Sequence, residues 1–434
     1  MFDGFLRVAA ATPDIRVADC NFNGASAAAL VSEAYEQGVS LLVLPELCLT
    51  GYTCSDLFLQ ESLLDGAVKA LLTLTEATRD KNMVVLAGLP LTVNGVLYNV
   101  AAVLHDGDIL GFVPKSYLPT YSEFYEGRHY HSGTDIEADV LFNGRTYPFG
   151  TRLLFRCRQM PAFTLGIEIC EDLWVAQPPS ISHALAGATV IANLSASDET
   201  TGKDIYRRSL VSGQSARLVC GYIYADAGEG ESSTDLVFGA HNLICENGSI
   251  LAESERFSNQ MIMADMDMSK LISERRRMTT WQPKFDNGYR VIDFDLEMHE
   301  VDLRRFIDPH PFVPDDAMDR TRRCEEILTI QAMGLKKRLA HTHCRHAVVG
   351  ISGGLDSTLA LLVTVRAFDM LDMDRSQIMA VTMPCFGTTD RTYHNACELV
   401  RRLGATLEEV DIKEAVTLHF SDIGQDPANH DVTY

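Results

Sequence analysis

The chain has 434 residues, and its 37 lysines and arginines against 59 aspartates and glutamates give a net charge of -22. A surface of this sign repels phosphate backbones and anionic lipids, so neither nucleic acid nor a membrane is an expected partner, although backbone N–H groups in a local pocket can still hold a phosphate. Because single hydrophobic cores stop growing at about 250–300 residues, the length predicts two domains.

The segment from residue 5 to residue 267 alternates short β-rich runs with helical ones, which is typical of packed layers of sheet and helix. Turn residues between apolar arms predict hairpins at 105–108 and 246–248. Strands are expected at 6–11, 41–44, 84–88, 98–104, 163–169, 190–193, 220–225 and 238–244, and helices at 23–37, 61–81 and 204–218.

The pattern changes after residue 268. A basic run, Arg275-Arg276-Arg277, and a proline-rich end predict a connector whose arginines lie on a solvated face. The remaining residues alternate helix and strand patterns in the order of a doubly wound parallel sheet. The predicted organisation is a domain at 1–270, a connector at 271–314 and a second domain at 315–434, with helices at 318–339 and 391–403 and strands at 347–350, 378–384 and 406–410.

Glu46 directly follows the apolar strand expected at 41–44. A carboxyl group at the exit of a buried strand is partly desolvated, which suits a general base. Many glutamates at such places only cap a strand or face solvent. Glu46 therefore needs partners before it indicates a catalytic site.

Lys115 lies just past the second arm of a predicted hairpin, between Pro114 and Pro119. Proline fixes φ and makes a loop rigid, which suits a lysine whose ammonium must point at one position. The alternative is an ordinary solvent-exposed lysine.

Cys170 ends the strand expected at 163–169 and is followed by two acidic residues and, at position 174, a tryptophan. The turn after a strand is a common place for a nucleophile, and a thiol needs a nearby base or cation to react. The remaining cysteines lack such neighbours and are expected to be structural.

Glu46, Lys115 and Cys170, in this order and each at a strand end, resemble the catalytic residues of the nitrilase superfamily. The resemblance implies an α/β fold, an α-β-β-α sandwich, in which Glu46 is the general base, Lys115 stabilises the oxyanion and Cys170 is the nucleophile. It also implies that the thiolate attacks a carboxamide carbon, after which water clears the thioester.

Four further residues resemble positions of the glutaminase branch of this superfamily. Glu126 is similar to the second glutamate, which orients the lysine and the nucleophile. Tyr52 and Tyr121 would line the amide pocket, and Ser197, which follows the strand expected at 190–193, would bind glutamine. A loop carboxylate, packing tyrosines and a turn-forming serine are the alternatives.

A run of small and polar residues, S-G-G-L-D-S-T, follows the strand expected at 347–350 and opens a helix. Its glycines let the backbone approach an anion, and the helix N-terminus directs N–H groups toward it. The run lacks the lysine of the G-x-x-x-x-G-K-[ST] loop, and it resembles the pyrophosphate loop of ATP pyrophosphatases. That resemblance implies ATP contacts from Ser352, Gly353, Gly354, Asp356, Ser357 and Thr358, and magnesium coordination by Asp356.

A nitrilase-like amidase joined to this loop resembles the glutamine-dependent NAD synthetases. The resemblance implies that glutamine is hydrolysed and that the ammonia converts nicotinic acid adenine dinucleotide to NAD at the expense of ATP. ATP and Mg²⁺ are then the expected cofactors of the second domain, and none is expected for the first. Because the family's second domain is longer than the segment after Pro314, the sequence predicts an incomplete synthetase domain and leaves the ligase step open.

Two other functions remain open: a stand-alone nitrilase-type amidase or carbamoylase, and a non-catalytic oligomerisation module. A homo-oligomer is expected, since sandwiches of this superfamily pair through helix faces. The chain lacks C-x-x-C pairs, an evident signal peptide and an apolar run of about 20 residues, which together predict a cytoplasmic location.

Overall fold

A computed structural model describes residues 4–233, 235–284, 288–386 and 388–429. The chain divides into two compact units, Met1–Phe306 and Ile307–Tyr434. The boundary falls inside the segment predicted to be a connector.

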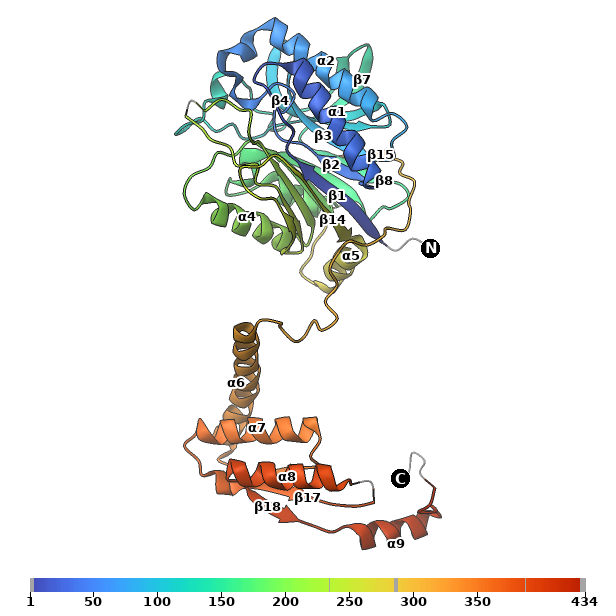
Figure 1. The fold of residues 1–434 in the computed structure, drawn as a ribbon, viewed down its shortest axis with the longest axis vertical. Helices are drawn as coiled ribbons and strands as arrows, with labels where there is room; N and C mark the ends of the chain where they lie inside the picture. The colour runs from blue at the N-terminus through green and yellow to red at the C-terminus, as the bar shows by residue number, and fades with distance from the viewer. Residues whose placement is uncertain (1–3, 234, 285–287, 387, 430–434) are drawn as a thin grey trace. The chain divides into compact units, whose positions relative to one another are not determined.

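The first unit is a four-layer sandwich, which confirms the predicted fold class (Figure 1). Helices α1 (Cys20–Glu36) and α2 (Glu61–Ala77) lie side by side over one sheet. Helices α3 (Pro179–Leu185) and α4 (Lys203–Leu218) cover the other. A central layer of apolar side chains fills the space between the two sheets.

The first sheet has eight strands in the described chain, in the order β14-β1-β2-β3-β4-β5-β7-β6. Both faces of its central strands are covered, so these strands are nearly continuous apolar runs rather than alternating ones. Its strands are β1 (Phe5–Ala11), β2 (Leu41–Val43), β3 (Val84–Val93), β4 (Val96–His105), β5 (Asp108–Pro114), β6 (Glu137–Phe142), β7 (Arg145–Gly150) and β14 (Met261–Asp267).

The second sheet has seven strands in the same part of the structure, in the order β13-β12-β11-β10-β9-β8-β15. Strands β9, β10 and β11 run parallel to one another, so their carboxyl ends meet at one edge. Its strands are β8 (Leu153–Cys157), β9 (Thr164–Ile169), β10 (Val190–Ser195), β11 (Gly221–Asp226), β12 (Leu243–Glu246), β13 (Ser249–Glu253) and β15 (Arg290–Phe294).

Two local predictions were wrong. The strand expected at 238–244 begins only at Leu243, because the residues before it form a loop in which Phe238 makes one isolated bridge to Asp198. The helix expected at 61–81 ends at Ala77.

The predicted connector also contains regular structure of the first unit. Helix α5 (Met268–Arg277) follows β14, and β15 pairs with β8 in parallel at the edge of the second sheet. This pairing joins residues far apart in the sequence, which is why local patterns did not indicate it.

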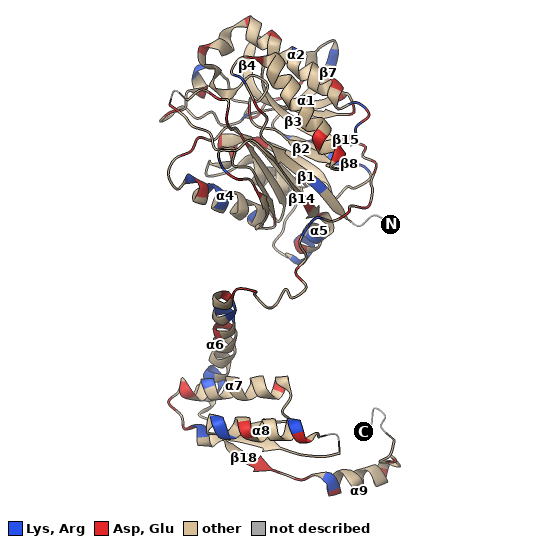
Figure 2. Ribbon diagram, viewed as in Figure 1, with Lys and Arg blue, Asp and Glu red and all other residues tan. Residues whose placement is uncertain are grey.

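Arg275 is buried, contrary to the prediction of a solvated face for the basic run. Its guanidinium donates hydrogen bonds to the carbonyl oxygens of Ala188, Leu218 and Val219, at 2.7, 3.0 and 3.0 Å. Burial lowers the pKa of Arg275 to about 10. Figure 2 shows that other charged side chains lie mainly on helices and loops, whereas the strands of the sandwich are largely uncharged.

The second unit contains a three-stranded parallel sheet in its described residues, in the order β16-β17-β18. This confirms the predicted strand–helix–strand order. No helix of the described chain is both long and apolar enough to cross a membrane. The elements are α6 (Ala317–Thr342), β16 (Ala347–Gly350), α7 (Leu355–Asp369), β17 (Ile378–Thr382), α8 (Asp390–Leu403), β18 (Thr406–Glu409) and α9 (Lys413–Ile423).

Candidate active site

Cys170 is the first residue after β9 and is only 6% exposed. Its φ of +44° is left-handed, a conformation that non-glycine residues rarely adopt and that is frequent at functional sites. Asn193, on the neighbouring strand β10, supports this conformation because its Oδ1 accepts the Cys170 N–H at 3.0 Å. The backbone therefore presents the thiol in one fixed direction.

Lys115 follows β5 and is fully buried between two carboxylates. Its Nζ lies 2.6 Å from Glu46 Oε1 and 2.6 Å from Glu126 Oε1. The structure thus brings together Glu46, Lys115 and Glu126, which were singled out in separate parts of the sequence. The alternative prediction of a solvent-exposed Lys115 was wrong.

Glu46 is held by hydrogen-bond donors on both of its oxygens. Besides Lys115, Asn99 Nδ2 donates to Oε1 at 2.6 Å, and the backbone N–H of Ala196 donates to Oε2 at 3.0 Å. Donors of this kind orient a carboxylate while leaving it able to accept a proton from a neighbour.

The thiol of Cys170 lies in the field of this cluster. Burial raises the pKa of Cys170 well above its usual value, and Glu46 raises it further, while Lys115 and the Ala196 N–H oppose the shift. This environment favours the neutral thiol over the thiolate, so a base must remove the proton before the sulfur can react.

The charges of Lys115 and Glu126 depend on each other. Burial alone would lower the pKa of Lys115, but Glu126 and Glu46 outweigh it and hold that pKa well above the usual value. Burial raises the pKa of Glu126 to about 7 despite the opposing charge of Lys115. The lysine consequently remains an ammonium throughout the neutral pH range.

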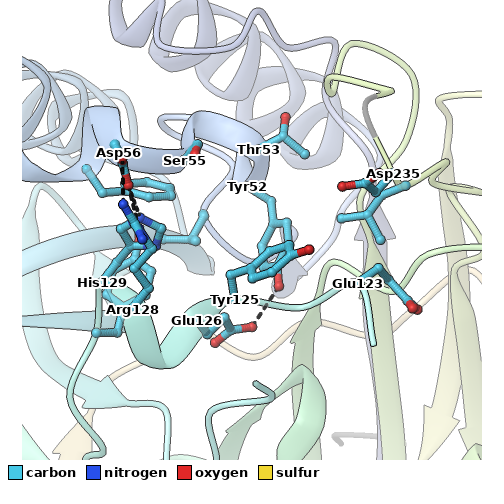
Figure 3. Close-up of a pocket in the computed structure, with 14 residues that line it drawn as sticks. Tyr52, Thr53, Ser55, Asp56, Glu123, Tyr125, Glu126, Arg128, His129 and Asp235 are labelled. Atoms are coloured by element: carbon cyan, nitrogen blue, oxygen red, sulfur yellow. Dashed lines mark hydrogen bonds and ion pairs between the residues drawn. The ribbon is translucent and has the colours of Figure 1, made fainter. Parts of the chain in front are cut away.

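A cavity of about 470 Å³ adjoins the cluster, with Glu126 in its wall (Figure 3). Tyr52 also lines it, and its hydroxyl donates to Glu126 Oε1 at 2.9 Å. To the left in the view, Asp56 accepts hydrogen bonds from Arg128 at 2.8 and 3.0 Å and lies 3.1 Å from His129 Nε2. The predicted pocket residue Tyr52 therefore joins the cavity to the buried charges.

The two other predicted glutamine contacts are placed differently. Tyr121 is 55% exposed, and its hydroxyl donates to Oε1 of Glu171, the residue next to Cys170, at 2.9 Å. Ser197 is buried, and its Oγ accepts a hydrogen bond from the buried Arg207 at 3.1 Å. Tyr121 thus contacts the residue next to Cys170, whereas Ser197 bonds to Arg207 and, through its N–H, to Asp226 rather than to the Glu46–Lys115 pair.

Sequence reasoning missed several residues around the thiol. Asn99 and Asp172 are buried and make polar contacts with the residues of the cluster or their neighbours. Lys203 pairs with Asp198, and its Nζ lies 5.4 Å from the centre of the Trp174 ring. Of these residues, only Asp172 could have been found from the sequence, because it is one of the two acidic residues that follow Cys170.

In the second unit, the six predicted ATP contacts lie together: Ser352, Gly353 and Gly354 in the loop after β16, and Asp356, Ser357 and Thr358 in the first turn of α7. Gly353 has a φ of +80°, and a Cβ there would come within 2.1 Å of the Thr392 carbonyl oxygen, so only glycine fits. The Ser352 and Ser357 hydroxyl oxygens are 3.2 Å apart. The first N–H groups of α7 have no partners within the helix, which leaves them available to an anion.

Comparison with known proteins finds two families along the chain. The carbon-nitrogen hydrolase family matches residues 7–276, and the NAD synthase family matches residues 327–432. The chain is 43% identical to a glutamine-dependent NAD(+) synthetase of Mycobacterium tuberculosis over 431 residues, which cover 97% of this chain and 64% of the relative. The corresponding protein of Mycobacterium leprae is 42% identical, with 99% and 65% covered.

A solved structure gives the same picture of the fold. A glutamine-dependent NAD(+) synthetase from Cytophaga hutchinsonii superimposes with a TM-score of 0.55 at 22% identity, covering 96% of this chain and 67% of that protein. The chain spans just under two thirds of the length of the two mycobacterial relatives named above. Because the match to residues 7–276 covers most of its length, the chain belongs to the carbon-nitrogen hydrolase family.

Proposed function

We propose that this chain is the glutaminase, with part of the synthetase, of a glutamine-dependent NAD synthetase. The observation that carries the proposal is the buried Lys115 Nζ, 2.6 Å from both Glu46 and Glu126, in a cluster whose charges act on Cys170. Such a cluster supplies a base, a nucleophile and a fixed positive charge in a site from which water is largely excluded.

In the proposed reaction, Glu46 takes the proton of the Cys170 thiol while the sulfur attacks the carboxamide carbon of glutamine. The carbonyl oxygen becomes an oxyanion, which the Lys115 ammonium stabilises. As the oxyanion collapses, the C–N bond breaks and Glu46 gives its proton to the leaving nitrogen, which departs as ammonia. Glu46 then removes a proton from water as the water oxygen attacks the thioester carbon. The C–S bond breaks, glutamate is released, and Glu46 returns the proton to the sulfur of Cys170.

Two charged groups near the thiol suit an amino acid as substrate. Glu171, next to Cys170, offers a carboxylate to an α-ammonium, and Lys203, whose ammonium also pairs with Asp198, offers a positive charge to an α-carboxylate. Burial raises the pKa of Glu171, and Lys203 is close enough to oppose this shift. Simple amides lack both charges, so the arrangement favours glutamine over the alternative substrates of a stand-alone amidase.

The loop of the second unit would bind the phosphates of ATP through Ser352, Gly353, Gly354, Ser357 and Thr358. Asp356, exposed in the first turn of α7, fits magnesium, which commonly takes one or two carboxylates together with phosphate oxygens. The magnesium would neutralise phosphate charge there. Adenylation of the carboxylate of nicotinic acid adenine dinucleotide would release pyrophosphate, and ammonia would displace AMP to give NAD. A homo-oligomer and a cytoplasmic location stay predictions.

Ammonia release and covalent labelling test the glutaminase. Wild-type chain should release ammonia from glutamine in preference to asparagine, simple amides and N-carbamoyl compounds, and a glutamine-mimicking diazo ketone should add one label, at Cys170, in peptide mass spectra. Cys170→Ala should lose both properties, whereas Cys344→Ala, which removes an exposed cysteine of the second unit, should keep both. Equal turnover of all amides, or labelling at another cysteine, would refute the proposal.

A further inference from the structure

Asp172 is a buried carboxylate to which the proposed reaction assigns no step. It is only 2% exposed, and its hydrogen bonds to nearby segments come from backbone N–H groups. Oδ1 accepts from Ser116 at 3.1 Å and from Tyr117 at 2.8 Å, and Oδ2 accepts from Ile169 at 3.0 Å.

These three donors flank two of the candidate catalytic residues. Ser116 and Tyr117 directly follow Lys115, and Ile169 directly precedes Cys170. Lys115 follows β5 of the eight-stranded sheet, whereas Cys170 follows β9 of the seven-stranded sheet. One carboxylate therefore joins the ends of two strands that belong to different sheets.

The bond to Ile169 alone would be an ordinary cap at the turn after β9. Capping does not account for the two bonds to the segment after Lys115, which come from the other sheet. Hydrogen bonds to a carboxylate are stronger than those between neutral groups, so this bridge restrains both segments more than a neutral side chain would.

We infer that Asp172 is a positioning residue, which sets the location of the Lys115 ammonium relative to the Cys170 thiol. The inference rests on the proposed amide hydrolysis for its meaning in catalysis, while the geometric coupling of the two residues can be measured without it. Burial raises the pKa of Asp172 to about 7, and the surrounding N–H groups favour its charged form.

Two substitutions separate position from charge. Asp172→Asn has the same shape but places an NH₂ group against a backbone N–H, so at least one of the three bonds is lost. Asp172→Glu retains the charge but is longer by one methylene, so its carboxylate cannot occupy the same place. Asp139→Asn, in the exposed β6 carboxylate that pairs with Arg290, is the matched control.

The rate of Cys170 alkylation by iodoacetamide, followed by intact mass as a function of pH, reports the coupling. Lys115 lowers the pKa of the thiol, so its displacement should move the alkylation profile of both Asp172 variants to higher pH. Loss of negative charge alone would move the profile of Asp172→Asn to lower pH and leave that of Asp172→Glu unchanged. In a Lys115→Gln background, substitution of Asp172 should produce no further upward shift, because the cation is already absent.

Glutamine turnover provides the second readout. We expect kcat to fall about 10- to 100-fold in both variants, as for a misplacement of about 1 Å, with KM changed by no more than about twofold. Asp139→Asn should match the wild type. An unchanged or downward-shifted profile, or an upward shift that persists without Lys115, would overturn the inference. A wild-type chain that does not hydrolyse glutamine would instead refute the proposed function, and the alkylation profiles would still decide the role of Asp172.

Discussion

Replacement of Lys115 by methionine should destabilise the first unit strongly, because it removes the cation between two buried carboxylates. Glu46 and Glu126 are 1% and 4% exposed, and each has an oxygen 2.6 Å from the Lys115 ammonium. Breaking a buried ion pair by removing one partner typically costs about 3–5 kcal/mol. At about 2 °C per kcal/mol for a domain of this size, Tm should fall by roughly 6–10 °C.

The loss should depend on pH through Glu126. In the wild type its pKa is raised to about 7, above the value of about 4.5 for an exposed glutamate, so stability from this group is present at low pH and is lost as pH rises through 7. Without Lys115 the two carboxylates repel each other and the pKa of Glu126 moves higher still. At about pH 6 Glu126 of the variant is protonated, which relieves its repulsion with Glu46. At about pH 8.5 a smaller fraction of Glu126 is protonated, so the stability difference between variant and wild type should grow with pH.

Thermal unfolding followed by circular dichroism at these two pH values measures the effect. Lys69→Met, which replaces an exposed lysine of α2, is the control and should change stability by less than about 0.5 kcal/mol. A Lys115→Met variant as stable as the control, or one whose deficit is smaller at the higher pH, would refute the reasoning.

Two further substitutions test features outside the candidate active site. Arg275→Met leaves three buried carbonyl oxygens without their donor and should lower the free energy of unfolding by about 3 kcal/mol, as measured by urea titration. The control Arg276→Met, which replaces an exposed arginine, should have little effect. Equal urea midpoints of the two variants would contradict the assigned contacts. Gly353→Ala introduces a Cβ at a positive φ and against the Thr392 carbonyl oxygen, so calorimetry should show ATP binding weakened by about tenfold or more. Gly350→Ala, where a Cβ meets no atom within 4 Å, should bind as the wild type does, and equal affinities of the two variants would rule out the loop as the phosphate site.

The elements that carry the candidate catalytic residues could be predicted because their signals are local. Apolar runs that end at Glu46 and Cys170, and prolines on both sides of Lys115, place each residue at a strand end in the sequence itself. The order of the three then indicated the sandwich. The hairpin before Lys115 was also predictable, since its turn residues lie between two apolar arms.

Other features depend on contacts between distant segments and left no local pattern. Asn99 contacts Glu46 across 53 positions in the sequence, and β15 pairs with β8 across more than a hundred. Arg275 is buried because it donates to three carbonyl groups at the ends of other elements. The basic residues next to it in the sequence therefore wrongly indicated a solvated face.

The parallel strand β15 has a practical consequence for expression of the glutaminase alone. Phe294, at its end, packs edge-on against Phe163, with ring centres 5.7 Å apart. A protein that stopped at residue 276, where the family match ends, would leave the β8 edge unpaired and Phe163 uncovered, which invites aggregation through strand addition. Extension to residue 306 retains this strand and the ion pair of Arg305 with the buried Glu246, so a correctly closed sandwich is expected at this length and not at 276.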